Sequence, residues 1–152
     1  MVATDNAAVC TREQVDPRGP RFGGAVTTVV LALALVFSGT TFGTILIAWQ
    51  TLVFALGAIV GLQAQPYGVF FRKVIRPRLS PPKEMEDAAP PRFAQAVGLA
   101  FLVVALVAAL VGATAVSMVA LAMALIAAFL NAAFAFCLGC EMYLLGKRLA
   151  HR

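Results

Sequence analysis

The sequence predicts an all-α membrane protein with four transmembrane helices, arranged as two parallel two-helix repeats. The chain of 152 residues is 61% hydrophobic and only 12% charged. Its charges leave two long blocks untouched, 22–71 and 93–140, and each block can hold two helices of roughly 20 residues. A motif that precedes the first block also recurs before the second. Soluble domains carry about a quarter charged residues and disordered chains have low hydrophobicity, so this composition excludes both classes.

Small and polar residues interrupt each charge-free block near its middle, at 38–44 and at 112–117. Such clusters favour tight turns, so each block divides into two helices. The first apolar stretch begins too late and runs too long for a secretory signal peptide, and we expect it to be a retained anchor. The four helices are expected at about 23–41, 45–63, 94–112 and 116–137.

The positions of the charged residues define the other segments of the chain. An N-terminal segment (1–22) precedes a transmembrane domain (23–146), which contains a basic, proline-rich linker (72–92), and a short tail (147–152) follows. All 12 Lys and Arg residues lie in these charged segments, which four passes place on one side of the membrane. The positive-inside rule makes that side cytoplasmic, together with both termini.

The chain contains an internal repeat with an offset of 71 residues, the separation of Asp16 from Asp87. The shared pattern is Asp-x-x-x-Pro-Arg-Phe-x-x-Ala-Val, and the repeats extend over about 16–71 and 87–145. Two passes return the chain to its starting side, so the repeats are parallel. We expect a pseudo-twofold axis along the membrane normal.

The repeated motif contains one arginine in each copy, Arg21 and Arg92. The simpler interpretation is a helix entry, in which Pro fits the first turn, Arg reaches into the head groups and Phe marks the interface. The alternative is a cationic patch formed by both arginines that binds a lipid phosphate, a small anion or a thiolate.

Cysteines are the candidate chemical groups. Cys137 and Cys140 form a Cys-x-x-Cys pair after the last apolar stretch, and Cys10 is expected on the same side. In a continuous helix the pair shares a face but lies at a helix C-terminus, where thiolates are disfavoured. If Gly139 breaks the helix, Cys140 instead opens a new segment. The hypotheses are redox thiols, metal binding through three thiolates, or inert packing; a permanent structural disulfide is not expected in the cytosol.

At these motifs the sequence resembles a family of four-helix bacterial membrane proteins catalogued as a domain of unknown function. The resemblance rests on Cys10, on the Asp-Ala-Ala-Pro-Pro-Arg-Phe entry at 87–93 and on the closing Phe-Ala-Phe-Cys-Leu-Gly-Cys-Glu-Met-Tyr at 134–143. It implies the four-helix fold and a bacterial plasma (inner) membrane. It also implies a link to thiol or sulfur metabolism, with thioredoxin-like or rhodanese-like cytosolic proteins as partners.

Other polar residues are less specific. Trp49, Gln50 and Asn131 lie within the apolar blocks, where they hydrogen-bond between helices or else line a transport path. The blocks contain no ionisable residue mid-membrane, which weakens the case for proton-coupled transport. We expect the basic linker to lie on anionic head groups, with docking of an acidic cytosolic partner as the alternative; nucleic-acid binding is not expected.

Three functions remain open at this point. The first is a thiol-redox or sulfur-relay protein that uses Cys137 and Cys140, with Cys10 as a third thiol. The second is a non-catalytic membrane anchor or accessory subunit, and the third is a carrier of small sulfur anions. The sequence shows no cofactor motif, leaves open whether the chain is an enzyme, and is compatible with a homo-oligomer or a larger membrane complex.

Overall fold

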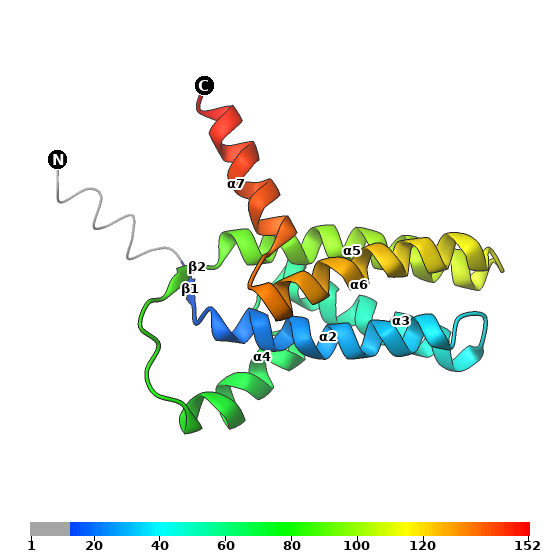
Figure 1. Cartoon of the computed structure of the whole chain (residues 1–152), viewed down its shortest axis with the longest axis horizontal. Coiled ribbons are helices and arrows are strands. Elements are labelled where there is room, and N and C mark those ends of the chain that lie inside the picture. Colours follow the sequence, from blue (N-terminus) through cyan, green and yellow to red (C-terminus); the bar gives the residue numbers. More distant parts are fainter. Residues whose placement is uncertain (1–12) are drawn as a thin grey trace.

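The computed structural model describes residues 13–152, and this part of the chain is mainly helical (Figure 1). Four of its helical spans are long and apolar enough to cross a membrane, which confirms the expected number within the described residues. They are α2 (Arg18–Val36), α3 (Thr41–Ala55) continued by the π-helical turn η1 (Leu56–Val60), α5 (Ala89–Leu110) and α6 (Thr114–Phe134).

The first and third spans begin earlier than the charge pattern predicts. They start at Arg18 and Ala89, whereas the charge-free blocks predicted 23 and 94. The Pro-Arg-Phe motifs therefore form the first turns of the helices and do not precede them. Proline is compatible with a first turn because the N–H that it lacks has no partner there. Charges limit the apolar length of a span without ending its helix.

Two tight turns lie at the end of the bundle away from the strands (Figure 1). Gly39 has φ 82° and Gly112 has φ 79°, a left-handed conformation that glycine adopts without steric cost. The hydroxyl oxygen of Thr40 accepts a hydrogen bond from the backbone N–H of Gly43 at 3.1 Å and caps α3. Both turns overlap the clusters of small and polar residues but begin and end earlier than predicted, because α3 starts at Thr41 and α6 at Thr114.

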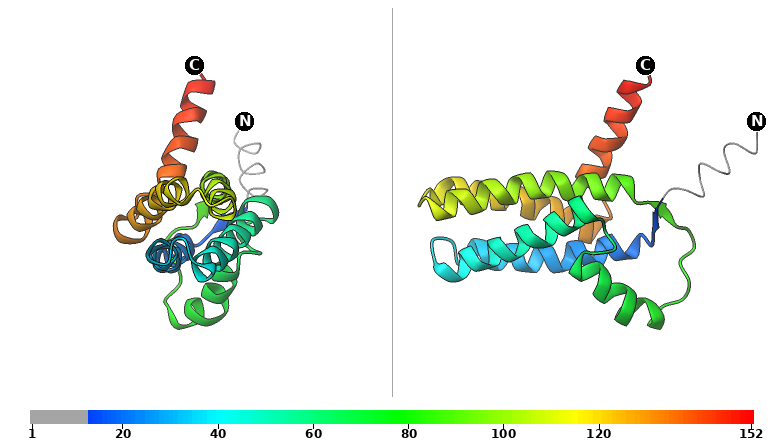
Figure 2. Two further views of the ribbon diagram at one scale, coloured as in Figure 1. Left: turned by 90° about the vertical axis from the view of Figure 1, so that its right-hand side faces the viewer. Right: turned by 180° about the vertical axis from the view of Figure 1, so that it is seen from behind.

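The four spans pack around a narrow core of leucine, isoleucine and alanine; the left view of Figure 2 shows the four spans end-on. α2 makes its largest contact with α6, and α5 packs on both α6 and α3. Many large apolar side chains face outward instead; Val36 is 77% exposed, Leu110 69% and Val119 66%. In water such a surface would be unstable, whereas lipid solvates it.

A chain of hydrogen bonds connects the first half of the molecule internally. The indole N–H of Trp49 donates to the Tyr67 hydroxyl at 3.0 Å, which donates to Gln50 Oε1 at 2.9 Å. Gln50 Nε2 in turn donates to the Thr27 hydroxyl oxygen at 2.9 Å. These groups therefore join α2, α3 and the following segment, the simpler of the two roles expected for Trp49 and Gln50.

Two short strands, β1 (Gln14–Val15) and β2 (Glu86–Asp87), pair antiparallel and hold the starts of α2 and α5 together. Next to them, the Asp16 carboxylate accepts hydrogen bonds from the backbone N–H and side chain of Arg18, the shortest at 2.8 Å. The Arg18 side chain holds the pKa of Asp16 below its ordinary value. Asp87 Oδ1 accepts from the backbone N–H of Ala89 at 2.9 Å in the same way.

Two helical segments leave the bundle on opposite sides (Figures 1 and 2). One is α4 (Pro66–Phe70), continued by η2 (Phe71–Ile75) and the 3₁₀ turn η3 (Arg76–Arg78). The other is α7 (Leu138–Ala150). The expected linker (72–92) is thus helical at its start, and most of the expected tail (147–152) is the last turn of α7. Because both segments are charged, the sequence predicted only a linker and a tail there. The residues of each are nevertheless compatible with a helix at the membrane surface.

Candidate thiol site and the adjoining cavity

A sharp break separates the fourth span from α7. α6 ends at Phe134, three residues before the predicted end at 137, and Ala135 adopts a left-handed conformation with φ 53°. The backbone N–H of Phe136 reaches back to the Leu130 carbonyl at 3.2 Å, which satisfies one of the last carbonyls of α6. The break thus lies before the cysteines: of the two alternatives, a continuous helix through Cys137 and Cys140 is wrong, and the chain breaks at Ala135 and not at Gly139, which lies inside α7.

Cys137 and Cys140 instead open α7. Cys137 is the N-cap residue, and its Sγ accepts a hydrogen bond from the backbone N–H of Cys140 at 3.3 Å. A disulfide joins the two cysteines, whose Cα atoms are 5.1 Å apart. Backbone N–H groups at a helix N-terminus stabilise negative charge on a sulfur atom, so the position suits a thiolate better than the expected helix C-terminus would.

Gly139 holds this pair against the start of α5. A Cβ atom at Gly139 would lie 2.5 Å from both the Cα and the Cβ of Ala94, so only glycine permits this approach. α7 accordingly makes most of its contacts with α5, although α6 is its neighbour in the chain. The glycine of the Cys-x-x-Cys motif therefore places the disulfide beside the third span.

The disulfide borders a cavity of about 690 Å³. Glycine and alanine of α2, α5 and α6 make up much of the lining, together with larger side chains such as Phe54, Phe101 and Met123. The polar and charged side chains of the lining are those of Arg21, Thr27, Glu86, Asp87, Gln95, Asn131 and Glu141. The lining includes Gly24 and Thr27 of α2, Gln95, Gly98 and Phe101 of α5, Met123, Ala127 and Asn131 of α6, and both cysteines.

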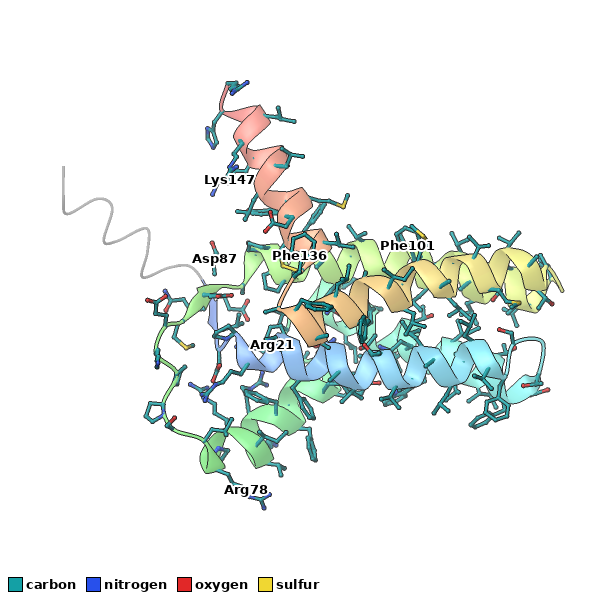
Figure 3. All side chains as sticks on the ribbon, in the orientation of Figure 1. Arg21, Arg78, Asp87, Phe101, Phe136 and Lys147 are labelled. Carbon is teal, nitrogen blue, oxygen red and sulfur yellow. A yellow bond between two sulfur atoms is a disulfide. The ribbon has the colours of Figure 1, made fainter. Side chains whose placement is uncertain are left out.

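Two of the expected polar residues meet at one wall of this cavity. Asn131 Nδ2 donates to the Pro20 carbonyl at 3.2 Å, and Arg21 Nη2 donates to the Ala132 carbonyl at 3.4 Å. Both bonds join the start of α2 to the end of α6. Figure 3 shows Arg21 and Phe136 near the end of the bundle from which α7 departs, with Phe101 farther along α5.

Arg92, the equivalent of Arg21 in the second copy of the motif, contacts the end of η1 and does not line the cavity. Its Nε donates to the Ala58 carbonyl at 3.0 Å and its Nη2 to the Ile59 carbonyl at 2.7 Å. Each arginine of the repeated motif thus bonds carbonyls near the end of a span in the other half of the chain, a role that the sequence did not suggest. The binding of an anion or a lipid phosphate by Arg21 and Arg92 stays a prediction.

Sequence reasoning missed Gln95, which lines the cavity and whose Oε1 accepts from Gln65 Nε2 at 3.0 Å. An amide two residues inside the apolar block at 93–140 was the available signal. Cys10 lies outside the described residues, so its role as a third thiol or a metal ligand stays a prediction. Among residues 13–152 no three His, Cys, Asp or Glu side chains gather in a way that would hold a metal ion.

A comparison with known families decides the classification. The domain of unknown function DUF4395 matches residues 15–148, which include β2, the four spans and the cysteine pair. The chain belongs to the DUF4395 family. No curated protein and no solved structure matches the chain. The DUF4395 domain is thus a unit of four apolar spans plus two outlying helical segments, and its function must be argued from its own geometry.

Proposed function

We propose that this DUF4395 protein is a membrane thiol-redox or sulfur-relay protein in which Cys137 and Cys140 alternate between dithiol and disulfide. The observation that carries the proposal is the placement of the pair at the first turn of α7, with the Cys140 N–H donating to the sulfur of Cys137. The reacting partner on the soluble side is a protein thiol or a sulfane-sulfur donor of the thioredoxin-like or rhodanese-like kind. The anchor and sulfur-anion carrier alternatives stay predictions.

The same proposal places the protein in a bacterial inner membrane, with both termini and the cysteine pair on the cytoplasmic side. The distribution of the 12 basic residues supports this orientation. The chain turns at Gly39 and Gly112 carry no charge and lie at the end of the bundle opposite the strands. A cytoplasmic pair is exposed to reducing partners, so its disulfide is a transient state in catalysis and not a permanent link.

We also propose that the two halves are parallel repeats. The support is the reciprocal contact of the two motif arginines. Arg21 of the first half bonds the end of α6, the last span of the second half, and Arg92 of the second half bonds the end of η1 in the first. Asp16 and Asp87, also related by the offset of 71 residues, each accept a hydrogen bond from the backbone two residues onward.

The decisive experiment measures the redox equilibrium of the pair in the full-length protein. Membranes containing the Cys10→Ser variant, which keeps only Cys137 and Cys140, are equilibrated with a series of glutathione buffers and tagged with a polymer-linked maleimide. We expect both tags to appear together, with a midpoint between about −120 and −270 mV, the range of thiol oxidoreductases. The control is the Cys10→Ser, Cys137→Ser double variant, which keeps only Cys140 and should show one tag at all potentials. A pair that is tagged, or protected, at every potential would disprove the proposal.

A further inference from the structure

We propose that the cavity beside the disulfide binds a lipid-soluble quinone, which accepts the two electrons released when Cys137 and Cys140 form their disulfide. The inference rests on the proposed function and names the electron acceptor of the same site. Three independent features of the cavity lead to it: its access from the bilayer, its contact with both sulfurs, and the hydrogen-bond donors in its wall.

The cavity is accessible from the lipid phase. Phe101 of α5 and Met123 of α6 line it and are also 36% and 52% exposed on the outer surface of the bundle. Farther along these helices the gap closes, where the Ser117 hydroxyl donates to the Ala105 carbonyl at 2.9 Å. The exposed side chains of Phe101 and Met123 mark the place between α5 and α6 where we expect a molecule to enter from the lipid. The volume of the cavity, about 690 Å³, is typical of sites for small organic ligands.

Both cysteines belong to the lining, so an occupant of the cavity lies beside the disulfide. The remaining wall is mostly apolar, with alanine and glycine where α2 and α6 face α5. The charged lining residues Arg21, Glu86, Asp87 and Glu141 lie at or beyond the ends of the spans, so a hydrophilic thiol such as glutathione is poorly suited to the apolar wall between the spans. The wall instead suits a flat, uncharged ring with an apolar tail, because burial of apolar surface stabilises binding.

Hydrogen-bond donors stand near the disulfide end of the same wall. The Gln95 amide uses its oxygen to accept from Gln65 Nε2, which leaves its own NH₂ group to donate. Asn131 and Arg21 contribute further N–H groups, each with one bond to a backbone carbonyl. Asn and Gln side chains offer two N–H donors and Arg offers five. Carbonyl oxygens of an uncharged ligand are the matching acceptors.

A quinone is the chemical class that meets all these requirements, since it dissolves in lipid, carries two carbonyl acceptors and takes up two electrons with two protons. In the balanced step, the two S–H bonds of the dithiol break and one S–S bond forms. The two electrons and two protons convert both quinone C=O groups to C–OH. The products are one disulfide and one quinol, and a protein dithiol on the soluble side then reduces the disulfide again by thiol–disulfide exchange.

The test uses the full-length Cys10→Ser protein, reduced and incorporated into lipid nanodiscs without quinone. Decylubiquinone is the probe, because its fully substituted ring cannot be alkylated by a thiol. We expect one quinol for each disulfide formed, measured by quinol absorbance and by the loss of maleimide-reactive thiols. A photoreactive azidoquinone should label peptides of α5 or α6, and excess decylubiquinone should prevent this labelling.

The matched variants fill the cavity or the opposite face of the same helix. Ala127→Phe places a ring inside the cavity, and Ala133→Phe places the same ring on an exposed position of α6 that does not line it. We expect Ala127→Phe to slow quinol formation by about tenfold or more and Ala133→Phe to leave it unchanged. Ala127→Leu is a smaller obstruction that serves if the phenylalanine variant does not fold. All variants should keep the glutathione midpoint.

The outcomes separate the two proposals. If the pair titrates with glutathione but yields no quinol, the quinone inference is overturned and the thiol-redox function stands. Azidoquinone labelling without oxidation of the dithiol also overturns it, since the cavity would then hold a lipid and not an electron acceptor. Equal rates in Ala127→Phe, Ala127→Leu and Ala133→Phe would place the reaction outside the cavity. If the pair does not titrate at all, the proposed function itself fails.

Discussion

Single residues determine where the chain breaks before the cysteine pair. Ala135 is the one residue other than glycine with a positive φ in residues 13–152, and a side chain at such an angle crowds its own backbone. Glycine is the usual residue at this position of a helix end. Alanine here therefore makes the break between α6 and α7 costlier than it needs to be, and substitution offers a direct measure of that cost.

We expect Ala135→Gly to stabilise the protein by about 0.5–1 kcal/mol, because glycine reaches this conformation without strain. The measurement is the unfolding temperature of the purified protein in detergent micelles. Ala133→Gly, two residues earlier inside α6, is the control and should destabilise by about 1 kcal/mol. Equal effects of the two substitutions would show that the left-handed conformation costs nothing.

Asp16 predicts a pH dependence of stability. Its pKa lies below the ordinary value of 3.8, chiefly because the Arg18 side chain bonds its carboxylate. The folded state therefore binds this proton less readily than the unfolded state does. The stabilisation by Asp16 is complete at pH values above 3.8, the ordinary pKa of the carboxyl group. It disappears as the pH falls through the lower pKa of the folded state. We expect Asp16→Asn to lower the unfolding temperature at about pH 7. The difference in unfolding temperature between the variant and the wild type should become smaller as the solution is acidified. A difference that is constant with pH would contradict this role.

At the scale of the elements, the sequence predicted the apolar spans and the turns but not the way in which the elements end. Hydropathy reports where apolar residues are, so it gave the right number of spans and the approximate positions of both turns. It carries no information on whether a charged turn continues a helix, and α2 and α5 were consequently placed five residues late. The sequence did not predict the strand pair, because Gln14 and Asp87 are far apart along the chain and adjacent only in the folded structure.

The candidate site shows the same limit. The spacing of Cys137 and Cys140 indicated that they lie close together, and Gly139 was noted as a residue that breaks helices. The actual break depends on Ala135, which carries no such signal. The cavity arises from alanines and glycines on three spans whose mutual packing cannot be read from one sequence without the fold.

The contact of α7 with α5 should depend on Gly139. We expect Gly139→Ala to displace the first turn of α7 from Ala94, because the added Cβ would overlap that residue. The expected result is a shift of the glutathione midpoint of the cysteine pair together with faster alkylation of the reduced thiols. Gly146→Ala is the matched control, since nothing lies within 4 Å of a Cβ added there. Unchanged redox behaviour in Gly139→Ala would show that docking on α5 does not influence the disulfide.

At the scale of the whole molecule, the orientation in the membrane can be tested directly. In a Cys10→Ser, Cys137→Ser, Cys140→Ser background, single cysteines are placed at Ser38 and Thr114, near the two turns, and at Ser80, between η3 and β2. We expect a membrane-impermeant maleimide to label the first two from outside intact spheroplasts and Ser80→Cys only after lysis. Labelling of Ser38→Cys and Ser80→Cys from the same side would exclude the proposed topology.

The pairing of β1 with β2 has a consequence for biosynthesis. Gln14 cannot find Asp87 until the ribosome has made both of the first two spans and the linker that follows them. The main contact of α2 forms even later, because its principal neighbour α6 is the last span to be made. The first half of the chain must therefore enter the bilayer with its main contacts unmade. Assembly of this protein is completed only when its final span arrives, and the cysteine pair is the part of the chain that emerges immediately afterwards.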